Sequence, residues 1–97
     1  MRLQITPLAQ RDLEEITDFI ALDNPARAVS FIDELRAQCT RLCANPSAYR
    51  LRPDIAGGLR SCAYGRYVIF FDVNERQLTI VRILHSARDV TQQFGSD

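Results

Sequence analysis

Residues 78–89 read LTIVRILHSARD, and this stretch decides how the chain folds. Its first seven residues are mostly branched aliphatics, which favour a β-strand because their side chains are stiff and pack well on a pleated surface. Strict alternation predicts two apolar faces, with Leu78, Ile80 and Leu84 on one and Val81 and Ile83 on the other. A strand that is apolar on both faces is typical of the interior of a sheet, so we expect it to be covered on both sides.

The same strand ends in a group of polar side chains. Arg82 interrupts one apolar face, His85 closes the other, and Arg88 and Asp89 follow. A half-buried guanidinium requires a polar partner, so one interpretation is an internal ion pair of Arg82 or Arg88 with Asp89. A second is a surface that contacts another molecule. For His85, a further alternative is a backbone hydrogen bond that only ends the strand.

Composition limits the classes of function. The chain has 97 residues without a linker-like segment, which predicts a single domain over residues 1–97. Twelve basic and twelve acidic residues give a net charge of zero, whereas proteins with a large nucleic-acid footprint usually have a basic excess. All the basic residues are Arg, a side chain suited to bidentate contacts with carboxylates or phosphates.

The three cysteines are an odd number, which argues against a closed set of disulfides. No spacing of Cys39, Cys43, Cys62 and His85 indicates zinc, so we expect small buried side chains, no metal and no cofactor. The sequence contains neither a signal-peptide pattern nor an apolar run long enough to span a bilayer. These features predict a cytoplasmic protein without a membrane partner.

Two amphipathic helices are predicted in the first half of the chain. Thr6-Pro7 and Asn24-Pro25 each combine an N-cap residue with proline at the first helical position. The first helix ends near Asp23, and the second begins at once with Asn24-Pro25 and ends at Asn45. Because almost no connection separates the two helices, they must form an antiparallel hairpin. On the first helix, five charged side chains are expected to face solvent: Arg11, Asp12, Glu14, Glu15 and Asp18.

The remaining segments alternate as strands. Residues 1–6 predict one strand, and 59–64, 66–73 and 78–84 predict a meander whose first turn is the single Gly65. An irregular connection spans 45–58. The predicted fold class is therefore α+β, in the order β-α-α-β-β-β, with a helical hairpin packed on one face of a small, mainly antiparallel sheet.

This arrangement leaves one face of the sheet to be covered. Two helices can cover only one face, yet two strands are apolar on both. Either the tail, through Val90 and Phe94, or another chain must cover the second face, and we expect another chain.

Six fragments of the sequence resemble one known family when taken in order. They are Ala9-x-x-Asp12-Leu13-x-x-Ile16, Asn24-Pro25-x-x-Ala28, Arg52-Pro53-Asp54-Ile55, Gly58-Leu59-Arg60-Ser61, Gly65-Arg66-Tyr67-Val68-Ile69-Phe70-Phe71 and Val81-Arg82-Ile83-Leu84-His85-Ser86-Ala87-Arg88-Asp89. Over nearly the whole chain, this order and spacing resemble the ParE toxins of the RelE/ParE toxin superfamily.

The resemblance implies a RelE/ParE-like fold and the toxin of a bacterial type II toxin–antitoxin module. It implies inhibition of DNA gyrase by binding, without catalytic residues. It also implies neutralisation by a ParD-like antitoxin, a ribbon-helix-helix DNA-binding protein that alone would connect the toxin to operator DNA. The extended segment of such an antitoxin lies in the groove of the helical hairpin and along the sheet.

Candidate site residues follow from the residue types and the resemblance. Those for the target are Arg60, Arg66, Arg82, His85 and Arg88. Those for the antitoxin are Phe31, Leu35, Arg50, Arg52, Phe70 and Asp89.

Two alternatives remain. The superfamily also contains RelE-like ribosome-dependent mRNA endonucleases, for which His85 would be the acid or base and the target-candidate arginines the phosphate clamps. The zero net charge, the absence of Lys, and a tail without Tyr or further basic residues after Asp89 argue against that activity. A degenerate toxin that binds antitoxin but lacks activity is the other alternative.

Overall fold

The structure is a computed structural model that describes residues 1–87 and Phe94. Its elements are β1 (Arg2–Ile5), α1 (Pro7–Asp23), α2 (Pro25–Ala44), the short 3-10 helix η1 (Pro46–Ala48), β2 (Arg50–Leu51), β3 (Arg60–Tyr64), β4 (Tyr67–Val73) and β5 (Gln77–His85). The five strands form one sheet in the order β1-β5-β4-β3-β2, in which only β1 and β5 pair in parallel. The predicted α+β class is confirmed, and β2 is an additional short strand within the predicted loop.

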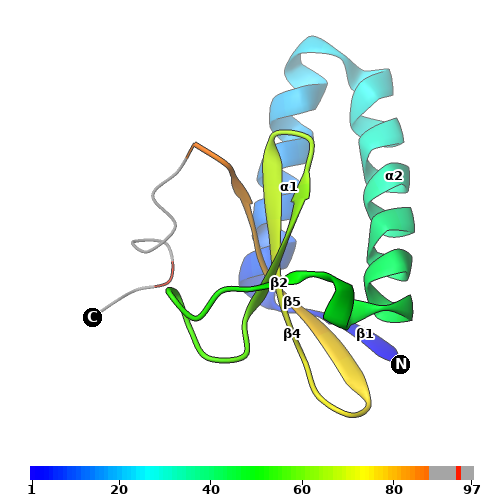
Figure 1. Cartoon of the computed structure of the whole chain (residues 1–97). Coiled ribbons are helices and arrows are strands. Elements are labelled where there is room, and N and C mark those ends of the chain that lie inside the picture. Colours follow the sequence, from blue (N-terminus) through cyan, green and yellow to red (C-terminus); the bar gives the residue numbers. More distant parts are fainter. Residues whose placement is uncertain (88–93, 95–97) are drawn as a thin grey trace.

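The helical hairpin forms as its cap residues predict. The Thr6 hydroxyl accepts the Ala9 N–H at 3.1 Å, and the Asn24 side chain accepts the Arg27 N–H at 3.1 Å. Asn24 also donates its own N–H to the Ile20 carbonyl, so one residue ends α1 and begins α2. Figure 1 shows the two helices side by side as a hairpin that extends beyond the sheet.

The turn between β3 and β4 differs from the prediction by one residue. Tyr64 pairs with Tyr67, so the turn contains Arg66 as well as Gly65. Gly65 has φ +58°, in the left-handed region where a glycine is favoured because it has no Cβ. The Arg66 side chain is therefore presented at the tip of a hairpin instead of along a strand.

A β-bulge changes the predicted faces of β5. Phe70 pairs with Arg82 and Phe71 with Ile80, which leaves Val81 as the extra residue on β5. Beyond the bulge the alternation is shifted, so Ile83 packs in the helix-side core with Ile80. Leu84 packs on the opposite face together with Val81. The prediction that Leu84 shares a face with Ile80 is wrong because strict alternation does not allow for an extra residue.

Two apolar cores lie on opposite faces of the sheet. The helix-side core contains the buried apolar residues of both helices and three strands: Ala9, Ile16, Phe31, Leu35, Cys39, Leu42, Cys62, Ile69, Phe71, Leu78, Ile80 and Ile83. The second core is formed by the buried side chains of Leu59, Phe70 and Leu84, with Ile55, Val68, Val81 and Phe94 packed against them.

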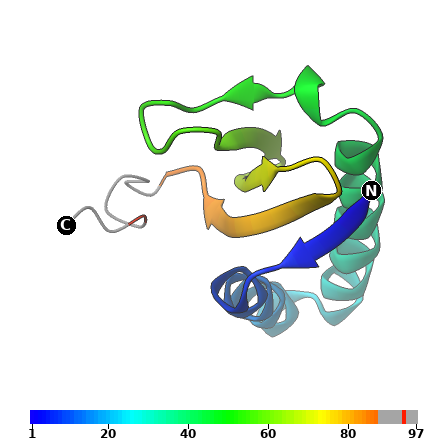
Figure 2. The same ribbon diagram turned by 90° about the horizontal axis from the view of Figure 1, so that it is seen from below.

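The chain itself covers the second face, and the expectation of another chain there is wrong. The connection after β2 folds back over the sheet, closed by the Arg52 N–H, which donates to the Leu59 carbonyl at 2.7 Å. In Figure 2 this connection lies on the side of the sheet away from α2. Phe94 contributes an edge-to-face contact with Phe70, with ring centroids 5.1 Å apart. The alternative that the tail covers this face is confirmed for Phe94, while Val90 lies outside the described residues.

Candidate partner-binding groove

Two adjoining hollows separate the helical hairpin from the end of the sheet, and we call them together the helix–hairpin groove. The first, about 460 Å³, is lined by Asp12, Glu15, Ile16, Phe19, Tyr67, Ile83, Leu84, His85 and Ala87. The second, about 550 Å³, is lined by Phe19, Ile20, Arg27, Phe31, Glu34, Tyr64, Gly65, Arg66 and Tyr67. Phe19 and Tyr67 line both hollows, so the groove is continuous between α1 and the β3–β4 turn.

Three exposed apolar side chains lie on the helical hairpin, and one of them, Phe19, lines the groove. Phe19 is 70% exposed, Leu22 is 87% exposed and Val29 is 62% exposed. These three residues lie near the junction of α1 and α2. Uncovered apolar surface therefore exists as expected, but on the helical hairpin instead of the second face of the sheet.

A buried ion pair attaches α1 to β5 at one end of the groove. Asp12 accepts from Arg82 through both oxygens, with Oδ2–Nε at 2.7 Å and Oδ1–Nη2 at 2.9 Å. The same carboxylate accepts the Ile83 N–H at 3.0 Å. The hydrogen bonds that Arg82 donates to Asp12 raise the pKa of Arg82. Arg82 thus has an internal ion-pair partner in Asp12, which the sequence did not predict, while the predicted partner, Asp89, lies outside the described residues.

Asp12 completes the hydrogen bonding of an exposed strand edge. The pairing of β1 with β5 stops at Ile80, whose carbonyl accepts the Thr6 N–H at 3.0 Å. The Thr6 hydroxyl then donates to the Val81 carbonyl at 2.8 Å, and Asp12 takes the next free N–H, that of Ile83. Side chains from the start of α1 therefore bond to two backbone groups of β5 beyond the point where β1 ends.

The expectation that Asp12 faces solvent is wrong, and sequence reasoning missed its role. Asp12 follows Ala9 by three residues and precedes Ile16 by four, and both of these residues are buried. That spacing places the three side chains on one face of the helix. Helical periodicity could therefore have placed this carboxylate on the buried face.

His85 closes β5 beside the groove. Its Nδ1 accepts the Ala87 N–H at 3.1 Å, which confirms the alternative that His85 ends the strand through a backbone hydrogen bond. Because Nδ1 is an acceptor there, the neutral ring bears its proton on Nε2. The ring contacts Tyr67 edge to face, with centroids 5.5 Å apart, and its side chain is exposed.

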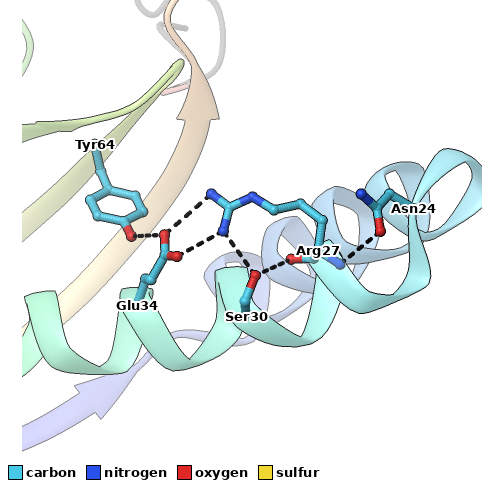
Figure 3. A network of polar contacts seen from close by, with 5 residues as sticks. All are labelled: Asn24, Arg27, Ser30, Glu34 and Tyr64. Atoms are coloured by element: carbon cyan, nitrogen blue, oxygen red, sulfur yellow. Dashed lines mark hydrogen bonds and ion pairs between the residues drawn. The ribbon is translucent and has the colours of Figure 1, made fainter.

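A polar network attaches the β3–β4 hairpin to α2 at the other end of the groove (Figure 3). Arg27 and Glu34 form two hydrogen bonds, of 2.8 and 3.2 Å, and the Tyr64 hydroxyl donates to Glu34 Oε1 at 2.8 Å. Arg27 also donates to the Ser30 hydroxyl at 2.9 Å. The hydrogen bonds from Arg27 and then Tyr64 lower the pKa of Glu34, while burial and the bond to Glu34 raise the pKa of Tyr64.

The groove gathers three of the five residues proposed for the target. His85 and Arg66 line it, and Arg82 is bonded to Asp12 in its wall. Arg60 lies elsewhere on the sheet and donates to the Tyr49 carbonyl at 2.7 Å. Arg88 lies outside the described residues.

The antitoxin candidates are placed differently from the expectation. Leu35 and Phe70 are buried in the two cores, and Phe31 is buried in the helix-side core while it also lines the second hollow of the groove. Arg52 pairs with Asp54 at 2.8 Å, and its guanidinium carbon lies 5.8 Å from the centroid of the Phe70 ring.

Of the two remaining antitoxin candidates, only Arg50 is among the described residues, and it does not line the groove. Arg50 is exposed on β2, at the edge of the sheet opposite β1. Asp89 lies outside the described residues. The exposed apolar residues Phe19, Leu22 and Val29, which the sequence did not single out, provide the surface instead.

Other chemistry is limited in the described part of the chain. Among residues 1–87 and Phe94, no group of three metal-binding side chains is close enough to hold an ion, and no helix is long and apolar enough to cross a membrane. Cys39 and Cys62 are buried thiols, as predicted, whereas Cys43 is only half-buried. Burial raises the pKa of Cys39 to about 11. A thiol with such a pKa is a poor nucleophile at neutral pH.

Comparisons with known proteins identify relatives over nearly the whole chain. The family model described as the ParE toxin of the type II toxin-antitoxin system parDE matches residues 3–90. Two curated proteins, each named Toxin ParE1, come from Mycobacterium tuberculosis strains CDC 1551 / Oshkosh and ATCC 25618 / H37Rv. Both are 33% identical over 98 residues, covering 96% of this chain and 97% of the relative.

A solved structure has the same kind of fold. It is titled Chromosomal ParDE TA system from P. aeruginosa and superposes with a TM-score of 0.75 at 24% identity. The match covers 88% of this chain and 95% of the other. At this identity the similarity supports the fold alone.

Proposed function

This chain belongs to the ParE toxin family of type II toxin–antitoxin systems, and we propose that it inhibits DNA gyrase by binding and is neutralised by a ParD-like antitoxin. The observation that carries the proposal is the match of the family model to residues 3–90. Both partners act in the bacterial cytoplasm, where we also place this chain. Contact with operator DNA is indirect, through the antitoxin.

The helix–hairpin groove supports the antitoxin part of the proposal. A segment that orders on binding must bury apolar area to offset its lost conformational entropy, and Phe19, Leu22 and Val29 offer that area. Helical hairpins with such surfaces commonly accept an amphipathic segment. A segment seated in the groove would also cover His85 and Arg66, so that binding of the antitoxin and of the target would exclude each other.

The engagement of the arginines supports a binding toxin over a nuclease. Metal-free RNA cleavage needs several cations free to surround one phosphate, in addition to an acid and a base. Arg82 is bonded to Asp12 and Arg60 to the Tyr49 carbonyl. Two carboxylates, Asp12 and Glu15, line the hollow that contains His85, and they would repel a phosphate there.

The test is a gyrase supercoiling assay with purified toxin, run beside an assay for cleavage of ribosome-bound mRNA. We expect the toxin to abolish supercoiling, to leave the mRNA intact and to lose its effect when a stoichiometric amount of antitoxin is added. Arg66→Ala should weaken inhibition, whereas Arg36→Ala, an exposed arginine on α2 that does not line the groove, should not. Cleaved mRNA with unchanged supercoiling would establish the nuclease instead.

A further inference from the structure

The two ends of the helix–hairpin groove carry opposite unbalanced charges. The carboxylates of Asp12 and Glu15 line the first hollow. The guanidinium of Arg82 is bonded to Asp12. Counted over the described residues alone, two carboxylates and one guanidinium leave an excess of one negative charge at this end. Within the described residues, Glu15 has no ion pair of its own.

Glu15 is nevertheless close enough to influence Arg82. Its charge raises the pKa of Arg82, but by less than the direct hydrogen bonds to Asp12 do. The guanidinium of Arg82 donates two hydrogen bonds to Asp12. Glu15 is exposed at the rim of the groove.

The second hollow has the reverse balance. Arg27 and Arg66 line it together with a single carboxylate, Glu34. Glu34 is bonded to Arg27 and to the Tyr64 hydroxyl, while the Arg66 side chain has no ion pair with any described residue. Two positive charges against one negative charge leave one positive charge, presented at the tip of the β3–β4 hairpin.

Apolar surface separates these two charges. Phe19 and Tyr67 line both hollows, and the exposed Phe19 ring lies between the end that contains Glu15 and the end that contains Arg66. The groove is therefore an apolar channel with a negative rim at one end and a positive rim at the other.

We propose that this charge order sets the direction and register in which the antitoxin segment lies in the groove. The segment carries a basic side chain at the Glu15 end, apolar side chains against Phe19 and Tyr67, and an acidic side chain at the Arg66 end. Reversing the segment places like charges together at both ends, which is costly at an interface and selects against the wrong partner. This inference rests on the proposed antitoxin binding and adds to it what fixes the direction of the bound segment.

The experiment measures the dissociation constant of toxin variants for a ParD-like ribbon-helix-helix antitoxin. Glu15→Arg and Arg66→Glu should each weaken binding by roughly tenfold or more, because each creates a like-charge contact. Glu14→Arg and Arg36→Glu are matched controls on the same fold that do not line the groove, and they should change binding by less than about twofold. Glu15→Gln, which disturbs Arg82 less, should weaken binding in the same direction by a smaller factor.

A charge exchange provides the decisive result. The double variant Glu15→Arg, Arg66→Glu should recover binding to an antitoxin whose two facing charges are also exchanged, and thermal melts establish that each variant is folded. If the groove and control variants behave alike, or if the exchange recovers nothing, the inference is overturned. In that case a loss of binding in Phe19→Ser would still support the proposed antitoxin surface, whereas an antitoxin that does not bind the unaltered toxin would overturn the proposed function.

Discussion

The two ion pairs that flank the groove use the same chemistry in different surroundings. Asp12 and Arg82 join α1 to β5, and their side chains are only 8% and 12% exposed. Arg27 and Glu34 lie on α2 near the β3–β4 hairpin, and their side chains are 45% and 49% exposed. Both pairs are bidentate, but only the first is enclosed by the core.

The difference in burial indicates which of the two ion pairs contributes more to the stability of the fold. A buried charge that loses its partner retains its desolvation cost, whereas an exposed charge that loses its partner returns to water. Asp12 also accepts the Ile83 N–H and so replaces a missing strand at the edge of β5. Glu34 bonds to no backbone N–H outside its own helix among the described residues, and it accepts a hydrogen bond from the Tyr64 hydroxyl.

The largest expected effect is that of Asp12→Ala. It leaves the buried guanidinium of Arg82 and the Ile83 N–H without this acceptor, and we expect a loss of roughly 3 to 5 kcal/mol in the free energy of unfolding. Urea denaturation followed by circular dichroism measures it. The control is Glu14→Ala on the same helix, which should change the free energy of unfolding by less than about 0.5 kcal/mol. Equal losses would mean that burial does not distinguish the two positions.

A double replacement sharpens the same comparison. Asp12→Leu combined with Arg82→Met removes both charges and retains much of the side-chain volume. We expect this variant to be more stable than Asp12→Ala by about 1 kcal/mol or more, although it still lacks the acceptor for the Ile83 N–H. A double variant as unstable as the single one would show that the cost comes from the strand edge and not from the unpaired charge.

Breaking the exposed pair should have little effect on stability. Arg27→Ala and Tyr64→Phe each remove contacts to Glu34, and we expect the melting temperature to stay close to that of the unaltered chain. The measurement is a thermal melt at low and at high salt, because screening should reduce even the small remaining difference. A destabilisation as large as that of Asp12→Ala would mean that the exposed pair contributes as much to stability as the buried pair.

The smallest expected effect is the acid dependence of the exposed pair. The pKa of Glu34 is lowered in the folded chain, so its carboxylate adds stability above its ordinary value of 4.5. That contribution is lost as the pH falls through the lower, folded pKa. Denaturation between neutral pH and the acid range should therefore show a small component that is absent in Glu34→Gln. A component that grew with rising pH above neutrality would have the wrong sign.

Much of the fold could be predicted because its signals are local. The helix boundaries follow from Thr6-Pro7 and Asn24-Pro25, whose cap hydrogen bonds join residues only three apart. The strands follow from runs of branched aliphatic side chains, and the family follows from motifs within short segments. Gly65 marked the β3–β4 turn correctly, although the turn includes one more residue than expected.

The candidate site was predicted less well. Leu35 and Phe70, two of the predicted partner contacts, are large and apolar, and that property buries them in the cores. Phe31 is also a core residue, but it lines the groove. Phe19 and Leu22 belong to apolar helical spacing as well, but they extend beyond the sheet that would have covered them. Sequence periodicity gives the apolar side of a helix but not the length over which a sheet accompanies it.

The elements, their order and the family can be derived from the sequence alone, because caps, periodicity and turn residues act within a few positions of the chain. Three features depend on the three-dimensional packing: which residues face the core beyond the bulge at Val81, what covers the second face of the sheet, and the bond of Arg82 to Asp12. These outcomes depend on contacts between distant segments, such as that of Asp12 with Arg82, which are separated by 70 positions. No local sequence pattern predicts this contact, because it depends on where β1 ends beside β5.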